Sequence, residues 1–205
     1  MKITLSNTGK RFNREWIFRH CSYEFHSGKT YAITGANGSG KSTLLQVIAG
    51  AILHNEGTIE FTDGQRTTDN EQHYTYISIA APYLELIEEM TAKEMLEFHS
   101  TFKPLIQSLS IKEMFRIVGL ENAINKQLRY FSSGMKQRLK LAQAFFSNTS
   151  ILLLDEPTTN LDADGIALYQ TLISQYTTDK LVIVSSNVKQ EYDFCEEVIE
   201  IGMYK

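Results

Sequence analysis

The stretch "YAITGANGSGKSTLLQVIAG", residues 31–50, joins an apolar strand pattern to an apolar helix pattern through a glycine-rich loop. The loop matches G-x-x-x-x-G-K-[S/T] from Gly35 to Ser42. The glycines allow backbone N–H groups to converge on phosphate oxygens, Lys41 reaches the β and γ phosphates, and Ser42 offers its hydroxyl to Mg²⁺. A glycine-rich turn without a ligand is the alternative. We expect phosphate contacts from the loop residues Gly35, Asn37, Gly38, Ser39, Gly40, Lys41, Ser42 and Thr43.

Two unbroken apolar runs, ILLL at 151–154 and LVIV at 181–184, indicate strands that are buried on both faces. Such strands predict a parallel sheet covered by helices. An acidic pair follows the first run. Asp155 is placed to hold magnesium through water, and Glu156 to orient or deprotonate an attacking water. The pair could instead be a helix-start signal, with Pro157 as the turn.

Strand and helix patterns alternate along the rest of the chain. Strands are predicted at 2–7, 16–25, 29–34, 57–64, 73–80, 151–155, 181–186 and 198–201, and helices at 135–147, 163–176 and near 188–195. From about 90 to 119 the sequence favours helices interrupted by Pro104, with Leu96, Phe98, Ile111, Phe115 and Ile117 as candidate core residues. The fold class is α/β: a mostly parallel sheet, an N-terminal antiparallel β portion and an inserted α-helical segment at about 82–134.

Composition excludes several classes of protein. The 205 residues suit one domain, and a net charge of −4 gives no strong field for nucleic acid, so we expect no nucleic-acid partner. Cys21 and Cys195 lack metal-ligand spacing, which indicates reduced thiols in a cytosolic protein. Because the sequence has no long apolar span and no apolar N-terminal leader, we expect the protein neither to cross a membrane nor to be exported.

A second candidate anion site lies at "FSSGMKQR", residues 131–138. A Ser-Ser-Gly turn leads into a helix whose first turns carry Lys136 and Arg138. Both the charge and the N–H groups of the helix start favour an anion there. An ordinary helix N-cap is the alternative. One small chain with two such sites needs an explanation.

The order of these elements resembles that of the ATP-binding cassette (ABC) ATPases, over nearly the whole chain. The family's signature, usually LSGGQ, corresponds to residues 131–135, its Walker B strand to 151–156 and its D-loop to 159–162. The resemblance implies a P-loop NTPase core and one ABC ATPase domain at 1–205. Its catalytic core would span about 1–81 and 135–205, and its helical subdomain, which ends in the signature turn, about 82–134.

The resemblance also implies ATP and Mg²⁺ as cofactors and, as partner, a second copy of the chain or a homologous cassette. In that family, two cassettes dimerise head to tail around two ATP. Ser132 and Gly134, with Ser133 in the same turn, would then contact the γ-phosphate of ATP held by the other copy. Phe12 stands where an aromatic residue stacks on adenine, a role that needs only a π face. A phenylalanine in a β portion could equally belong to the core.

Two residues usual in the family are missing. No glutamine occurs between His73 and Ile106, so Ala81 or Pro82 occupies the place of the expected Gln. Asn187, or Ser186 in a shifted register, replaces the expected His, and no histidine follows His99. Lost transition-state contacts of this kind typically matter by a few kcal/mol. We therefore expect intact ATP binding but slow hydrolysis that depends on Glu156, with Asn187 still able to donate a hydrogen bond to phosphate.

The leading interpretation is the ATPase subunit of a transporter, held at the cytoplasmic face of the membrane by a separate polytopic membrane subunit. The acidic residues Glu85, Glu88 and Glu89 lie where the family docks that partner's coupling helix, which predicts a basic helix; a solvated acidic face is the alternative. Two other functions remain open at this point. One is a soluble cassette in assembly, repair or translation, and the other is a regulatory module that binds ATP and dimerises but scarcely hydrolyses it.

Overall fold

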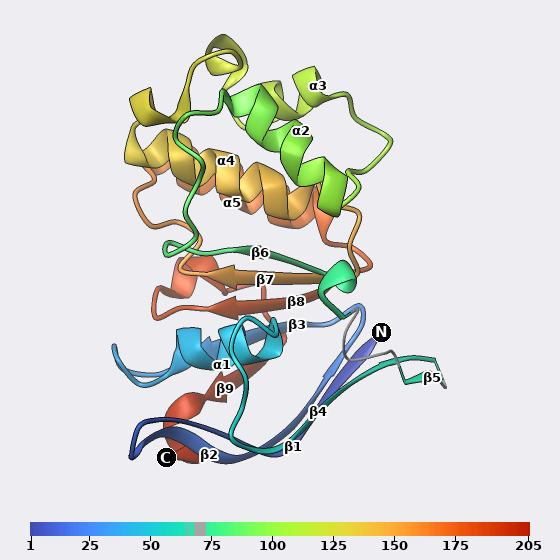
Figure 1. The fold of residues 1–205 in the computed structure, drawn as a ribbon, viewed down its shortest axis with the longest axis vertical. Helices are drawn as coiled ribbons and strands as arrows, with labels where there is room; N and C mark the ends of the chain where they lie inside the picture. The colour runs from blue at the N-terminus through green and yellow to red at the C-terminus, as the bar shows by residue number, and fades with distance from the viewer. Residues whose placement is uncertain (65, 68–72) are drawn as a thin grey trace. The chain divides into compact units, whose positions relative to one another are not determined.

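Two β-sheets and a group of helices make up the chain (Figure 1), for which the computed structural model describes residues 1–64, 66–67 and 73–205. Internal contacts divide the chain into two units. Unit 1 consists of Met1–Ile79, Ser150–Glu156 and Asp179–Lys205, and unit 2 of Ala80–Thr149 and Pro157–Thr178. Nearly all strand residues belong to unit 1, and most helical residues belong to unit 2.

An antiparallel sheet forms the N-terminal part of unit 1, as the sequence predicts. Its strands, in the order β2-β1-β4-β5, are β1 (Lys2–Phe12), β2 (Glu15–His26), β4 (Glu56–Asp63) and β5 (Arg66–Thr67). The β1–β2 hairpin pairs Phe12 with Glu15. Asn13 in its turn has a φ of 54°, a left-handed conformation that asparagine tolerates better than most residues. The turn therefore fixes Phe12 at the end of the sheet.

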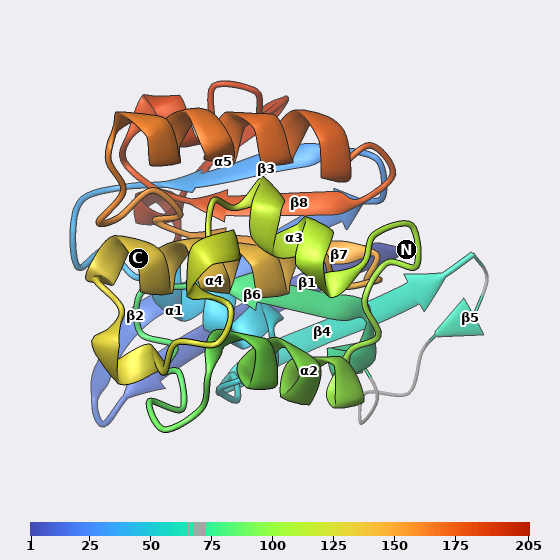
Figure 2. The ribbon, with the colours of Figure 1, turned by 90° about the horizontal axis from the view of Figure 1, so that it is seen from above.

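A second sheet has the order β6-β7-β8-β3-β9. Its strands are β3 (Thr30–Thr34), β6 (Ile77–Ala80), β7 (Ile151–Asp155), β8 (Leu181–Ser185) and β9 (Glu197–Glu200). The pairs β7–β8, β8–β3 and β3–β9 are parallel, and Figure 2 shows β3 beside β8. Every residue of β7 and β8 is buried, as unbroken apolar runs predict. Parallel strands end at the same edge, so residues that follow β3, β7 and β8 come together there.

Helix α1 (Lys41–Ile48) shares one apolar core with both sheets of unit 1. Ile3 and Phe25 of the antiparallel sheet, Ile33 of β3, and Leu44 and Leu45 of α1 are all fully buried in it. Because β3 and α1 are both held in the core, the loop that joins them is anchored at both ends. This burial positions the glycine-rich loop.

Unit 2 is helical, and its helices begin at capping residues. They are α2 (Ala92–Phe102), α3 (Ile111–Ile117), α4 (Ser133–Phe145) and α5 (Ala163–Tyr176). Thr91 and Ser110 form capping boxes with Glu94 and Glu113. Helices α4 and α5 pack through aromatic contacts, among them an edge-to-face pair of Phe145 and Tyr169 with ring centroids 6.4 Å apart. The predicted α-helical portion and α/β class are confirmed.

Several local predictions are wrong. The strand predicted at 73–80 is strand only in β6, because residues 73–76 form a 3-10 turn. The helix predicted near 188–195 is a 3-10 turn at Lys189–Glu191, since residues 187–190 are exposed and provide no apolar face to pack. Phe98 is 41% exposed, whereas Leu96 and Phe115 are buried. Two helical positions differ by about 200° of rotation, so Leu96 and Phe98 cannot both face the core.

Contacts group α4 and α5 with unit 2, although the sequence interpretation assigned residues 135–205 to the catalytic core. The division of one domain into a core and a helical subdomain by function stays a prediction. Among residues 1–64, 66–67 and 73–205, no helix is both long enough and apolar enough to cross a membrane.

Candidate nucleotide-binding site

The loop between β3 and α1 depends on two glycines for its backbone conformation. Gly35 and Gly40 have φ values of 142° and 105°, which strain any residue with a Cβ. A Cβ on Gly40 would also lie 2.5 Å from the Ile17 side chain, and one on Gly35 would lie 2.8 Å from Ser39 Oγ. Only glycine fits at these two positions, so both glycines of the motif are explained by the fold of unit 1.

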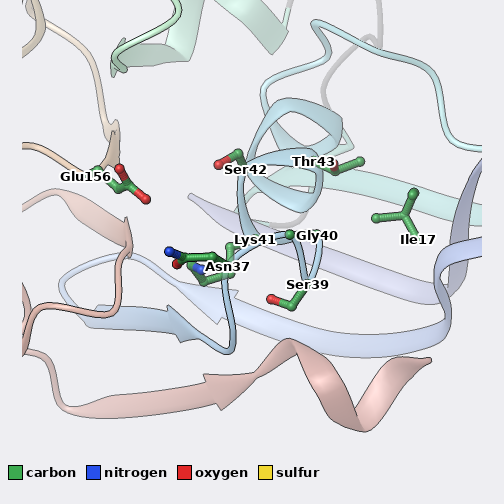
Figure 3. Close-up of a pocket in the computed structure, with 9 residues that line it drawn as sticks. Ile17, Asn37, Ser39, Gly40, Lys41, Ser42, Thr43 and Glu156 are labelled. Atoms are coloured by element: carbon green, nitrogen blue, oxygen red, sulfur yellow. The ribbon is translucent and has the colours of Figure 1, made fainter.

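A cavity of about 210 Å³ lies against this loop. Figure 3 shows the side chains of Ser42 and Glu156 pointing into the space between the loop and the end of β7. The lining residues are Ile17, Asn37, Gly38, Ser39, Gly40, Lys41, Ser42, Thr43 and Glu156. The cavity thus unites predicted phosphate-binding residues with the predicted catalytic carboxylate. Ile17 was missed, because no motif marks a β2 residue that packs under the loop.

Lys41 is nearly buried, with 5% exposure, and its ammonium group is held by the loop. Its Nζ donates to the carbonyl oxygens of Gly35 at 2.9 Å and Ala36 at 3.3 Å. These carbonyls hold the ammonium beside the backbone N–H groups of the same loop. A cation fixed in this way complements the charge of a phosphate.

Asp155 ends β7 with a carboxylate that is only 1% exposed. Burial raises its pKa, while the nearby hydroxyls of Ser42 and Ser185 act in the opposite direction. Within the described part of the chain, Oδ1 makes no hydrogen bond of good geometry. An orphaned buried carboxylate oxygen beside a hydroxyl is a fit for a hard cation or its bound water.

Glu156 follows with a φ of 42°, a left-handed conformation that is unusual for glutamate. Its backbone N–H donates to the Ser185 carbonyl at 2.9 Å, which ties the strained residue to β8. Such strain costs on the order of 1–3 kcal/mol and is typical of functional positions. Here the turn places the Glu156 carboxylate on the cavity wall.

Asn187 follows β8 and reaches the loop directly. Its Oδ1 accepts from Gly35 N at 3.3 Å, and its Nδ2 donates to Asn37 Oδ1 at 2.9 Å. Ser186, the other candidate for the missing His, is fully buried, and its hydroxyl accepts from Val188 N at 2.8 Å. Asn187 is therefore the residue of this pair that meets the phosphate loop.

Phe12 is 49% exposed, so the alternative that it belongs to the core is wrong. It pairs with Glu15 of β2, and the register of the two strands shifts between Lys10 and Arg11. Lys10 Nζ lies 4.9 Å from the centroid of the Phe12 ring. Stacking of adenine on Phe12 stays a prediction.

The signature turn in unit 2 begins α4. Ser132 is the N-cap, and its Oγ accepts from Met135 N at 3.2 Å. The two cations expected to face an anion are engaged elsewhere: Lys136 bonds Glu88 at 2.6 Å, and Arg138 bonds Asp162 at 3.2 Å. The turn has hydroxyl and helix N–H groups, whereas the charges of Lys136 and Arg138 are compensated by carboxylates of unit 2.

A cavity of about 470 Å³ lies beside this turn and the D-loop segment. A Cβ on Gly134 would lie 3.0 Å from the Asn160 carbonyl oxygen, so this glycine allows the close approach. The cavity is lined by Gly119, Leu120, Ser132, Ser133, Gly134, Met135, Arg138, Asn160, Leu161 and Asp162. Unit 2 therefore brings the predicted signature residues together with the D-loop.

A glycine-rich loop with a fixed lysine, opposite an acidic pair that ends a buried parallel strand, defines a P-loop NTPase. The sequence model of the ABC transporter family matches residues 18–159. An ABC transporter ATP-binding protein of Bacillus subtilis, YybJ, whose function is uncharacterized, is 31% identical over 202 residues, which cover 98% of this chain and 92% of the relative. The chain belongs to the ABC transporter family, as the resemblance implied.

The chain also resembles a transport protein and a solved dimeric structure. The lantibiotic transport ATP-binding protein SrtF of Streptococcus pyogenes is 28% identical, with 96% of this chain and 85% of the relative covered. In fold, the chain resembles the dimeric ATP-binding cassette MJ0796 bound to ADP and phosphate, with a TM-score of 0.80, 23% identity and coverage of 98% and 95%. The chain is an ATP-binding and ATP-hydrolysing subunit of an ABC transporter. A soluble or purely regulatory module is not favoured.

Proposed function

We propose that two copies of this subunit close head to tail around two ATP molecules and drive a separate polytopic membrane subunit from the cytoplasmic face of the membrane. One observation carries the proposal. The loop in unit 1 has a fixed lysine and the buried Asp155 nearby, whereas the signature turn in unit 2 has neutralised cations and only hydroxyl and N–H donors. Each element suits half of a shared site.

In this proposal ATP binds to the loop of residues 35–43, with Lys41 at the β and γ phosphates. Mg²⁺ would be held by the Ser42 hydroxyl and, through water, by Asp155, and it would offset charge on the phosphates. The described residues contain no cluster of three or more His, Cys, Asp or Glu side chains suited to a metal. This suits Mg²⁺, which is usually bound by one or two protein groups together with phosphates and waters.

Glu156 orients or deprotonates the attacking water in this scheme, and hydrolysis is slow because the usual Gln and His are absent. Ala81, one candidate for the place of the Gln, is fully buried. Lys140 Nζ binds the carbonyl oxygens of Ala81 at 3.2 Å and Pro82 at 2.9 Å. Neither Ala81 nor Pro82 has the side-chain amide that the Gln of the family provides at this point.

The test is the Glu156→Gln variant, compared with Glu60→Gln, which changes an exposed carboxylate on β4. Loss of a general base typically lowers the rate by 10²-fold or more. We expect phosphate release to fall at least about 100-fold in Glu156→Gln only, with ATP binding retained and a dimer on light scattering at saturating MgATP. Unchanged phosphate release would exclude Glu156, and a monomer even with the natural membrane subunit would exclude the shared site.

The membrane subunit is proposed to dock at the segment of Glu85, Glu88 and Glu89. Glu88 pairs with Lys136, and Glu89 with Arg129 at 3.7 Å, so two of these three charges are already compensated. Among the described residues, Glu85 makes no ion pair and lines a cavity of about 340 Å³ with Lys136 and Lys140. This mixed surface suits a partner helix with one basic residue directed at Glu85, rather than a uniformly basic one.

Co-purification of a membrane protein from detergent extracts tests this docking. Glu85→Lys should weaken the capture strongly, whereas Glu121→Lys, a charge reversal at another exposed position of unit 2, should not. If Glu85→Lys captures the membrane subunit as well as the parent chain does, the docking segment is wrong.

A further inference from the structure

We propose that Asn187 is a positioning residue that holds the phosphate loop in its binding conformation for ADP and ATP alike, instead of a donor reserved for the γ-phosphate. The inference rests on the proposed binding of nucleotide at this loop. It revises the role that the sequence assigned to Asn187, because the structure shows what the side-chain amide contacts.

The amide of Asn187 bridges two points of the loop. Gly35 N–H is a donor only, so it requires the carbonyl oxygen of the amide, 3.3 Å away. This orientation turns the NH₂ group toward Asn37 Oδ1, at 2.9 Å. The acceptor and one donor hydrogen of Asn187 are therefore committed to the loop. A side chain without both functions on one planar group cannot make this bridge.

Asn187 is itself held by β8. Ser186 N–H donates to the Ile33 carbonyl of β3 at 3.2 Å, and the Ser186 hydroxyl accepts from Val188 N at 2.8 Å. These bonds fix the backbone on both sides of Asn187. The bridge thus runs from a rigid position at the end of β8 to a loop that is exposed at Asn37.

The bridged segment is the one that holds the lysine. The carbonyl oxygens bonded to Lys41 Nζ belong to Gly35 and Ala36, which lie between or at the points that Asn187 contacts. Fixing this segment keeps the ammonium and the loop N–H groups in place before a phosphate arrives. Preorganisation of this kind raises affinity without changing a chemical step. It also acts on every ligand that occupies the loop.

The test measures ADP and ATP affinity by calorimetry for Asn187→Ala, Asn37→Ala and the double variant, with Gln190→Ala as an exposed amide control in the same segment. We expect Asn187→Ala to weaken both nucleotides by the same factor, about threefold to tenfold, the range for one or two exposed hydrogen bonds. The ratio of the ADP affinity to the ATP affinity should stay within about twofold of the ratio in the parent chain. The double variant should be no weaker than Asn187→Ala alone, because one bridge is lost in each case.

Two results would overturn the proposal. If ATP affinity or the turnover number falls while ADP affinity is unchanged, the amide serves the γ-phosphate; if no affinity changes, the bridge is inert. The Lys41→Ala variant distinguishes a failure of this proposal from a failure of the proposed function. A parent chain that binds no ATP, or that binds it equally well after Lys41→Ala, refutes nucleotide binding at the loop itself. Thermal unfolding confirms that each variant is folded, and Asn37→Ala tests the bridge independently of residue 187.

Discussion

The two helix-start elements of this chain, the β3–α1 loop and the signature turn, differ in what surrounds them. Beside the loop, Lys41 Nζ donates to backbone carbonyls, and its charge acts on the Asp155 carboxylate without a direct ion pair among the described residues. Beside the signature turn, Lys136 and Arg138 are paired with carboxylates. Two similar patterns of glycine, serine and lysine thus have different electrostatics. The number of cations near a turn is a poor guide to anion binding unless their partners are known.

The largest expected effect on ATP binding separates Lys41 from Lys136. Lys41→Ala should weaken ATP binding by the isolated protein by about 10- to 100-fold, since charged hydrogen bonds contribute about 1.5–3 kcal/mol. Lys136→Ala should change the affinity less than twofold, because this lysine is engaged with Glu88. Titration with ATP measures both. An equal loss in the two variants would show that the charge around the signature turn is available to nucleotide after all.

A dependence of folding stability on pH is expected from His99 in unit 2. Burial, assisted by the charge of Lys103, lowers the pKa of His99 from 6.5 to about 4, and His99 Nε2 lies 2.8 Å from Ser147 Oγ. At pH values between about 4 and 6.5, His99 is largely protonated in the unfolded chain and largely neutral in the folded chain. The free energy of unfolding should therefore fall as the pH falls, by about 1–2 kcal/mol from pH 7 to 5.

Urea unfolding at pH 7 and pH 5 measures this loss, and His99→Gln provides the matched control. The glutamine amide can still donate to Ser147 but does not titrate. The variant should lose less stability than the parent chain over this range. Equal losses in the two proteins would show that other groups control the acid sensitivity.

The smallest expected change in stability concerns Ser132, for which two roles are predicted: helix cap and phosphate ligand. Ser132→Ala removes the cap on Met135 N and should cost about 0.5–1 kcal/mol of stability. Ser132→Asp keeps an equivalent cap but places a negative charge where a γ-phosphate would lie. In a Glu156→Gln background, it should therefore prevent the ATP-dependent dimer while leaving stability nearly unchanged. A dimer of normal strength with Asp at this position would restrict Ser132 to capping.

Much of the fold could be predicted because its signals are local. The apolar runs at 151–154 and 181–184 identified β7 and β8, and the glycine motif identified the loop between β3 and α1. The predictions failed where the decision depended on distant packing. Residues 187–190 are exposed and provide no apolar face for a helix, and the direction of Phe98 depends on which side of α2 faces the rest of unit 2.

The sequence alone determined the family, the nucleotide chemistry and most candidate residues, because a phosphate loop and an acidic strand end depend on residues that are close in the chain. Tertiary structure alone decided how the side chains are used. It brought Asn187 to Gly35 and Asn37 across some 150 residues, and it paired Lys136 and Arg138 with acids from other segments. Charge and hydrogen-bonding capacity are properties of a residue, but whether they remain available depends on the partners that folding brings within reach.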